Sequence, residues 1–163
     1  MSMENIPVRK SVRKIVFLNS LMKSAKEEKS NYKRLIVQEN VISFMIIAAM
    51  FFIEDFLNKV MQEVKLSKVR TIEIKQKIKI GFNHEELEKK TLGQLIYAIS
   101  PFLHEDKVLN DHLKEFCDLR NDISHKVFKK YETLDELEES SKKAVAVGDK
   151  LIKDIYSFID KIE

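Results

Sequence analysis

Hydrophobic residues recur along most of the chain at intervals of three or four positions, the spacing that lines one face of an α-helix. Residues 8–29 show this pattern among many basic side chains and predict a first helix. A longer helix is expected from Asn31 onward. Because it is apolar on nearly every side between Val41 and Leu57, it should be the central helix, with partners on several faces.

The second half of the chain predicts three more helices with recognisable starts. The hydroxyl of Thr91 can accept a hydrogen bond from the first turn of a helix over 92–100. The next helix is expected over 106–130. Thr-Leu-Asp-Glu at 133–136 has the pattern of a capping box, in which the Thr and Glu side chains each accept from the other's backbone N–H. It predicts a last helix that runs to about residue 159.

The helical pattern breaks down between residues 66 and 83. Four isoleucines in this segment lie two apart within each pair but four apart between the pairs, so strand alternation and helical spacing both fit. We therefore expect an irregular connector or a short hairpin, with one strongly basic edge formed by Lys75, Lys77 and Lys79.

Composition supports an all-α fold. The 163 residues contain only five Gly and Pro together, no Trp and 34% charged residues, a balance typical of long helices. This length suits one domain. We expect a single antiparallel bundle of about five helices over residues 1–163, in which residues 1–30 could form an accessory N-terminal helix.

Positive charge is unevenly distributed, although the net charge is only +3. Residues 1–34 carry nine Lys and Arg against three Glu, and residues 65–80 carry six against one. Such regions suit a polyanion such as RNA, although solvated helix faces produce the same pattern. The weak candidates for RNA binding are Arg9, Lys10, Arg13, Lys14, Lys75, Lys77 and Lys79.

The sequence predicts a cytoplasmic protein without a membrane segment. The apolar run Val41–Ile53 has 13 residues and leads directly into two acids, whereas a membrane-spanning helix needs about 20 residues. The apolar run near the N-terminus is too short for a secretory signal. Cys117 is the single cysteine, so no intrachain disulfide can form, and a buried structural thiol is the expected role.

One arginine interrupts the apolar stripe of the helix over 106–130. Arg120 takes the place in that stripe between Phe116 and Ile123. A guanidinium that packs inward needs several acceptors, and the positions three and four residues away hold no carboxylate. The acceptors must come from another helix, another chain or a ligand. In the alternative interpretation, Arg120 reaches solvent or pairs with an acid of a neighbouring helix.

His125 follows this arginine by five residues. It could be an ordinary surface histidine. Imidazole is, however, the side chain whose unperturbed pKa lies nearest neutrality, and a nearby guanidinium can hold a phosphate and stabilise negative charge on its oxygens. The pair therefore suits phosphodiester chemistry.

Residues 120–125, Arg-Asn-Asp-Ile-Ser-His, resemble the signature of HEPN domains, the higher eukaryotes and prokaryotes nucleotide-binding superfamily. The family is all-helical, has about this length and carries the motif near the end of a late helix. The resemblance implies metal-independent RNA cleavage, in which the substrate's 2′-hydroxyl attacks the adjacent phosphate. Arg120 would hold that phosphate, His125 would move protons, and Asn121 would help to orient the site.

The resemblance also implies a homodimer with the motif helix at or near the interface. On an ideal helix, Arg120 and His125 point about 140° apart and lie about 7.5 Å apart along the axis. Both cannot face one small substrate unless the helix distorts or lies in a cleft. A twofold interface would bring a second pair close to the first.

The resemblance also bears on partners, and the sequence bears on cofactors. Toxin and phage-defence members suggest that partners could include an antitoxin or regulatory protein. Some toxin members carry a modified tyrosine two residues after the His, where this chain has Val127, so that form of regulation is not expected. We expect no metal and no cofactor, because the histidines lack the spacing of a zinc motif and the three glycines form no phosphate-binding loop.

Three hypotheses remain from the sequence. The first is a HEPN-like ribonuclease. The second is a non-catalytic helical module of the same fold that binds RNA, a nucleotide or a protein partner. The third is an unrelated helical interaction protein.

Overall fold

The computed structural model describes residue 16 and residues 30–162, without the side chains of residues 127 and 128. The predicted helix over 8–29, with Arg9, Lys10, Arg13 and Lys14, lies outside the described residues except for Val16. The described residues form helices and connections only. The elements are α2 (Asn31–Glu63), α3 (Lys68–Lys77), α4 (His84–Glu88), α5 (Leu92–Ile99), the 3₁₀ turn η2 (Ser100–Leu103), α6 (Lys107–His125), α7 (Val127–Lys130) and α8 (Leu134–Ile162).

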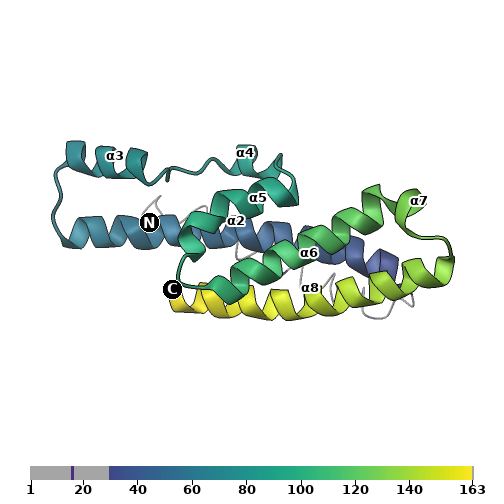
Figure 1. Cartoon of the computed structure of the whole chain (residues 1–163). Helices are drawn as coiled ribbons and strands as arrows, with labels where there is room; N and C mark the ends of the chain where they lie inside the picture. The colour runs from purple at the N-terminus through teal and green to yellow at the C-terminus, as the bar shows by residue number, and fades with distance from the viewer. Residues whose placement is uncertain (1–15, 17–29, 163) are drawn as a thin grey trace.

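The all-α helical bundle expected from the sequence is confirmed, and its main layer consists of α2, α6 and α8 (Figure 1). The directions of these helices follow from their cross-contacts. Between α2 and α8, Asn31 bonds to Glu138 and Gln38 to Val145, so both residue numbers rise together and the helices are parallel. Between α6 and α8, His112 meets Asp154 whereas Asp106 meets Lys161, so these helices are antiparallel. The bundle is therefore not antiparallel throughout.

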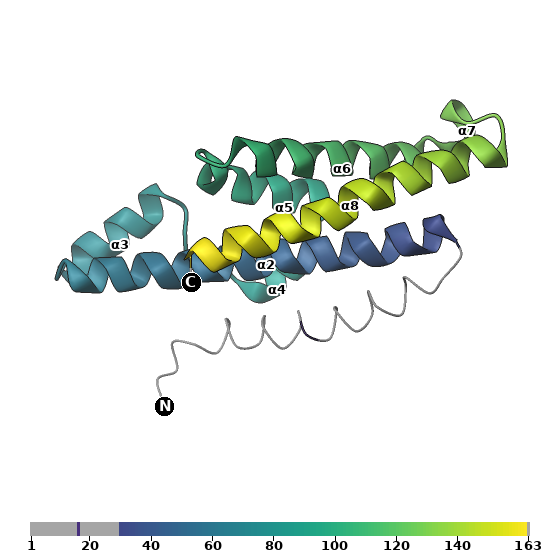
Figure 2. The ribbon, with the colours of Figure 1, turned by 90° about the horizontal axis from the view of Figure 1, so that it is seen from below.

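Helix α2 is the central helix, as its apolar surface predicts. Between Val41 and Ile53, all residues except Ser43 and Phe44 are buried. By length and composition alone α2 could cross a membrane, but 67% of its most apolar window is buried inside the molecule. Its hydrophobic faces are covered by α8, α5 and α4, as Figure 2 also shows from below.

The prediction of an irregular connector or hairpin at 66–83 is wrong for residues 68–77, which form α3. The Ser67 hydroxyl accepts from the N–H of Arg70 and caps the helix, so the spacing of four between the isoleucine pairs was the correct signal. Two residues after the last residue of α2 and of α3 stands a lysine with positive φ, Lys65 and Lys79, each at 53°. Glycine usually occupies such positions, so the usual sequence signal for a helix end is missing in both places.

The predicted helix starts at Thr91 and Thr133 are confirmed. Thr91 and Gln94 form a reciprocal capping box at α5, and Thr133 and Glu136 form the same pair of bonds before α8. The helix predicted over 106–130 ends earlier, at His125. Lys126 leaves the helical conformation and the short α7 follows.

Helices α2, α6 and α8 approach closely at Gly148 of α8. A Cβ atom at this position would lie 2.9 Å from the Phe116 ring and still closer to the Gln38 side chain. The buried Gln38 amide donates to the Val145 carbonyl and to Asp149. This contact fixes how α2 lies against α8, and the next residue of α2 belongs to the candidate site.

Candidate functional site

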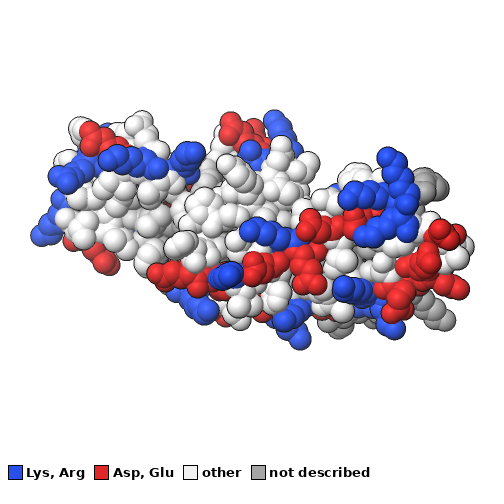
Figure 3. Space-filling model, in the orientation of Figure 1, with Lys and Arg blue, Asp and Glu red and all other residues white. Residues whose placement is uncertain are grey.

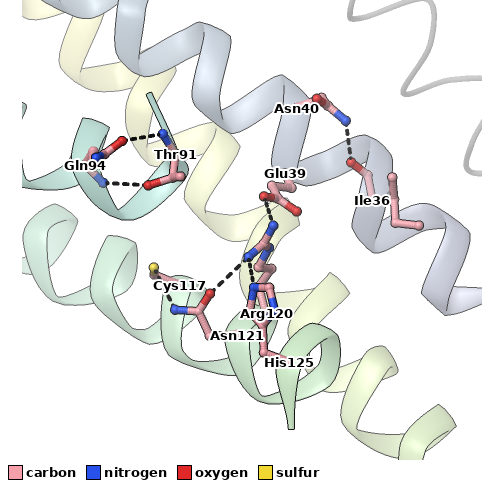
Figure 4. A network of polar contacts seen from close by, with 9 residues as sticks. All are labelled: Ile36, Glu39, Asn40, Thr91, Gln94, Cys117, Arg120, Asn121 and His125. Carbon is pink, nitrogen blue, oxygen red and sulfur yellow. Dashed lines mark hydrogen bonds and ion pairs between the residues drawn. The ribbon is translucent and has the colours of Figure 1, made fainter. Parts of the chain in front are cut away.

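Arg120 is half-buried at the side of α6 that faces α2, with 24% of its side chain exposed. Its Nη2 forms an ion pair of 2.5 Å with Oε1 of Glu39, which lies on α2. Its Nη1 lies 3.0 Å from Oδ1 of Asn121 and 3.1 Å from Nε2 of His125. Figure 4 shows Glu39 and His125 on opposite sides of the guanidinium group.

The inward-facing guanidinium therefore finds its carboxylate on another helix of the same chain. This is the outcome that the alternative interpretation of Arg120 expected, a pair with an acid of a neighbouring helix. The ion pair does not use all the donors of Arg120: its Nε is buried and has no hydrogen-bond partner among the described residues. A guanidinium carries five N–H groups, so further acceptors can join the cluster at Nη1 and Nη2.

Glu39 was not among the residues predicted from the sequence. It lies in α2 within the triplet Gln38-Glu39-Asn40, directly before the apolar run that begins at Val41. Three successive polar residues within the mostly apolar stretch 35–53 of this helix were the available signal. Gln38 turns toward α8 and Asn40 bonds to the Ile36 carbonyl of its own helix, which leaves Glu39 facing α6.

His125 meets Arg120 although an ideal helix would separate their directions by about 140°. His125 is the last residue of α6, and its imidazole lies back against the guanidinium. The helix continues through His125, so the side chains make this contact by reaching toward each other, without a break in α6. Because a guanidinium only donates, Nε2 of His125 accepts this hydrogen bond and the ring proton belongs on Nδ1.

Arg120 and His125 line one cleft of about 380 Å³, together with Glu39. Its other walls come from α2 and from the turn between α4 and α5, where Lys90 and Thr91 lie. One cleft thus combines a carboxylate, a guanidinium and an imidazole. The guanidinium lies in the middle and contacts the other two groups. Such a set can bind an oxyanion, remove a proton and supply one.

Asn121 links the cluster to the only cysteine. Its Oδ1 accepts from Arg120 and its Nδ2 lies 3.6 Å from the sulfur of Cys117. Burial, more than the neighbouring Asp118, raises the pKa of the Cys117 thiol. A thiol with a raised pKa is a weak nucleophile at neutral pH. Cys117 is only partly buried, whereas the sequence predicted a buried thiol.

Asp122 fastens the segment that follows His125. Its carboxylate pairs with Lys130 and, at 2.9 Å, with Lys126. Hydrogen bonds from Lys130 and Lys126 hold the pKa of Asp122 below its usual value, and Asp122 raises the pKa of Lys130. These bonds join the end of α6 to α7 beside the imidazole.

The remaining predicted RNA-binding residues lie away from this cleft. Lys77 and Lys79 line a separate groove beside α5, and Lys75 faces the distal end of α2. The structure therefore brings together Arg120, Asn121 and His125 but not the basic residues of the segment 66–83.

Two of the other histidines, His84 and His112, have structural surroundings, whereas His104 is exposed. His84 stacks on Phe51 with ring centroids 5.3 Å apart, and His112 bonds to Asp154 of α8 at 2.7 Å. Among the described residues, no three His, Cys, Asp or Glu side chains gather as the ligands of a metal ion would.

Comparison with known proteins leaves the family open, because the chain matches no family model, no curated protein and no solved structure. The resemblance to HEPN domains consequently rests on residues 120–125 and the helical architecture.

Proposed function

We propose that this chain is a metal-independent endoribonuclease of the HEPN type, in which Glu39, Arg120 and His125 form the catalytic group. One observation carries the proposal: the guanidinium of Arg120 contacts both a carboxylate and an imidazole at the edge of a single cleft. An ion pair between Glu39 and Arg120 that only stabilised the fold would not require the contact with His125. Transfer of an RNA phosphate is accelerated by a proton acceptor, a proton donor and a positive charge that stabilises the phosphate oxygens.

In the proposed reaction, the Glu39 carboxylate accepts the proton of the substrate's 2′-hydroxyl, whose oxygen bonds to the adjacent phosphorus. The bond from phosphorus to the 5′-oxygen of the next nucleotide breaks, and the imidazolium of His125 gives that oxygen a proton. The products are a 2′,3′-cyclic phosphate and a 5′-hydroxyl. Exchange with water then restores both side chains.

Arg120 binds the scissile phosphate between these two groups. As the phosphate arrives, its oxygens take the place of Nε2 of His125 as acceptors at Nη1. The freed Nε2 takes up a proton from solvent, and the resulting imidazolium acts as the acid. Glu39 keeps the guanidinium oriented through Nη2. Removal of one such charge-stabilising donor costs on the order of a hundredfold in rate.

The cellular setting belongs to the same proposal. We infer a cytoplasmic nuclease of the toxin or phage-defence kind, with RNA as substrate and with an antitoxin or regulatory protein as a further partner. The contact between Arg120 and His125 within one chain means that a second subunit is not required to unite them. A homodimer with α6 near its interface remains a prediction, and the mass of the protein in solution tests it.

The direct experiment is incubation of the purified chain with single-stranded RNA in EDTA, followed by analysis of the new ends. Cyclic phosphates and 5′-hydroxyls are expected from the wild type, with losses of about a hundredfold or more in Arg120→Ala and His125→Ala. His104→Ala removes an exposed histidine outside the cleft and is the matched control. Cleavage that persists in both cleft variants would contradict the proposal.

The second hypothesis, a non-catalytic module of the same fold, is favoured by a different feature of the same cluster. Glu39 already neutralises Arg120, as it would in a motif kept for packing. Such a protein would bind RNA, a nucleotide or a protein without cleaving RNA. Binding that is unchanged in His125→Ala, together with the absence of new RNA ends, would favour this module over the nuclease.

A further inference from the structure

A second and larger groove lies on the other side of α5 from the candidate site. It has a volume of about 1140 Å³ and lies between α5, the end of α2 and the segment that follows α3. Its floor is apolar and aromatic, with Phe82 and Phe102 among the lining residues. Their rings pack edge to face with centroids 6.2 Å apart, so the floor is a fixed surface.

The most unusual lining residue of this groove is Tyr97. Its side chain is 83% exposed, the same value as Leu134 and the highest among the large hydrophobic residues described. The neighbouring Ile78 is 40% exposed. An exposed aromatic ring contributes little to folding, and beside an apolar floor it offers a flat face to a ligand.

The rim of the groove is basic. Lys77 and Lys79 border it from the end of α3, and Lys90 borders it from the turn before α5. Figure 3 shows the uncharged surface over α5 with Lys or Arg side chains at its edges toward α3 and α4. An apolar floor with a cationic rim suits a ligand that has flat apolar parts and negative charges, and nucleic acid bases on a phosphate backbone have both.

Lys90 connects this groove to the candidate catalytic cleft, because this residue lines both. Helix α5 separates the two: Leu92 and Leu95 face the cleft, whereas Gln94 and Tyr97 face the groove. A strand that crosses the turn at Lys90 would enter both sites, with one phosphate at Arg120 and further bases in the groove.

We propose that this groove is a base-stacking subsite for single-stranded RNA, in which unpaired bases next to the scissile phosphate stack on Tyr97 and the phenylalanine floor. Lys77, Lys79 and Lys90 hold the phosphates of the same segment. This inference rests on the proposed nuclease function, because the cleaved phosphate at Arg120 defines which part of the RNA strand enters the groove. It assigns the enzyme to unpaired RNA, because paired bases cannot expose a face to the ring of Tyr97.

The test uses the full chain and a ten-nucleotide RNA whose 2′-hydroxyls are methylated, so that it cannot be cleaved. Tyr97→Ala should weaken its binding roughly tenfold, the scale of one lost stacking contact. Tyr32→Ala, which removes an exposed aromatic ring from the first turn of α2, is the matched control and should leave affinity unchanged. A 5-iodouridine in the same RNA should cross-link to Tyr97 or Phe102 on illumination.

Charge is tested in the same assay. Lys77→Ala with Lys79→Ala should weaken binding and flatten its salt dependence. Lys142→Ala with Lys143→Ala removes two exposed lysines from α8 and is the control pair. With cleavable RNA, Tyr97→Ala should raise KM for the long substrate and leave kcat unchanged, and it should have little effect on a dinucleotide.

The outcomes separate this inference from the nuclease proposal. Cleavage of RNA with normal affinity in Tyr97→Ala, and cross-links elsewhere, would overturn the subsite and leave the nuclease intact. Binding that depends on Tyr97 without any cleavage of unmodified RNA would overturn the nuclease and uphold the subsite. Absence of RNA binding by the wild type would overturn both.

Discussion

His112 and His125 lie on the same helix, α6, and each contacts a cationic side chain, yet their surroundings differ. His112 lies half-buried between α6 and α8, where Nδ1 bonds to Asp154 at 2.7 Å and Nε2 lies 3.2 Å from Nζ of Lys150. His125 is exposed at the end of the helix, where Nε2 accepts from Arg120.

The difference lies in which ring nitrogens remain for a substrate. Both nitrogens of His112 are occupied by α8, so this histidine joins two helices. Within the described residues, His125 has one occupied nitrogen, and the cation that occupies it also binds Glu39 across a cleft. Similar side chains thus serve as a structural joint at one end of α6 and as a candidate reaction centre at the other.

The largest expected effect is a loss of RNA cleavage on substitution of His125 that substitution of His112 does not cause. His125→Ala should lower kcat for RNA cleavage by about a hundredfold or more and leave thermal stability nearly unchanged, because its side chain is exposed. His112→Ala should do the reverse, with normal kcat and a loss of about 1 kcal/mol in the free energy of unfolding. Cleavage assays and urea unfolding measure the two effects. Equal losses of activity in both variants would end the distinction.

The carboxylate of Glu39 provides the next test. Glu39→Gln keeps the shape of the side chain but removes the proposed proton acceptor, so kcat should fall by about a hundredfold while KM changes little. Glu63→Gln, an exposed position in the last turn of α2, is the matched control. Full activity in folded Glu39→Gln protein would return Glu39 to the role of a structural partner for Arg120.

Gly148→Ala tests how far the site depends on the position of α2. A methyl group would collide with the Phe116 ring of α6 and the Gln38 side chain of α2, so these side chains or their helices must move away from α8. Overpacking of this kind costs about 1–3 kcal/mol of folding free energy. Activity should fall as well, because Gln38 adjoins Glu39.

Gly93→Ala is the matched control for that substitution, measured by the same urea unfolding. Its Cβ would meet only the Cys117 sulfur, at an ordinary 3.8 Å, and Ala favours a helix over Gly by up to about 1 kcal/mol. It should therefore be neutral or stabilising. A similar loss of stability in both variants would show that close approach at Gly148 is not the cause.

The smallest effect is expected at Asp122, beside His125. Because its pKa in the folded protein is lowered by Lys130 and Lys126, its stabilising effect is present above the usual aspartate pKa and is lost as the pH falls through the lowered value. Thermal melting of Asp122→Asn should therefore show a small deficit at pH 7 that disappears in strong acid. A deficit that stays constant with pH would exclude the charge as its source.

Much of the fold could be predicted from local sequence, as the starts of α5, α6 and α8 illustrate. Each begins at a side chain that accepts a hydrogen bond from its own first turn, so the signal lies within a few residues. The ends of α2 and α3 could not be predicted in this way. Lysines with positive φ stand there in place of glycine.

The sequence by itself determined that Arg120 occupies the apolar stripe of α6, between Phe116 and Ile123, and that an inward-facing guanidinium there needs a negative partner. Only the tertiary structure decided that this partner is Glu39 and that His125 lies beside them. Helical periodicity shows which residues share one face of a helix, but it does not show which other helix packs on that face. The meeting of α2 with α6 depends on long-range packing, in which Gly148 lets α8 approach both helices.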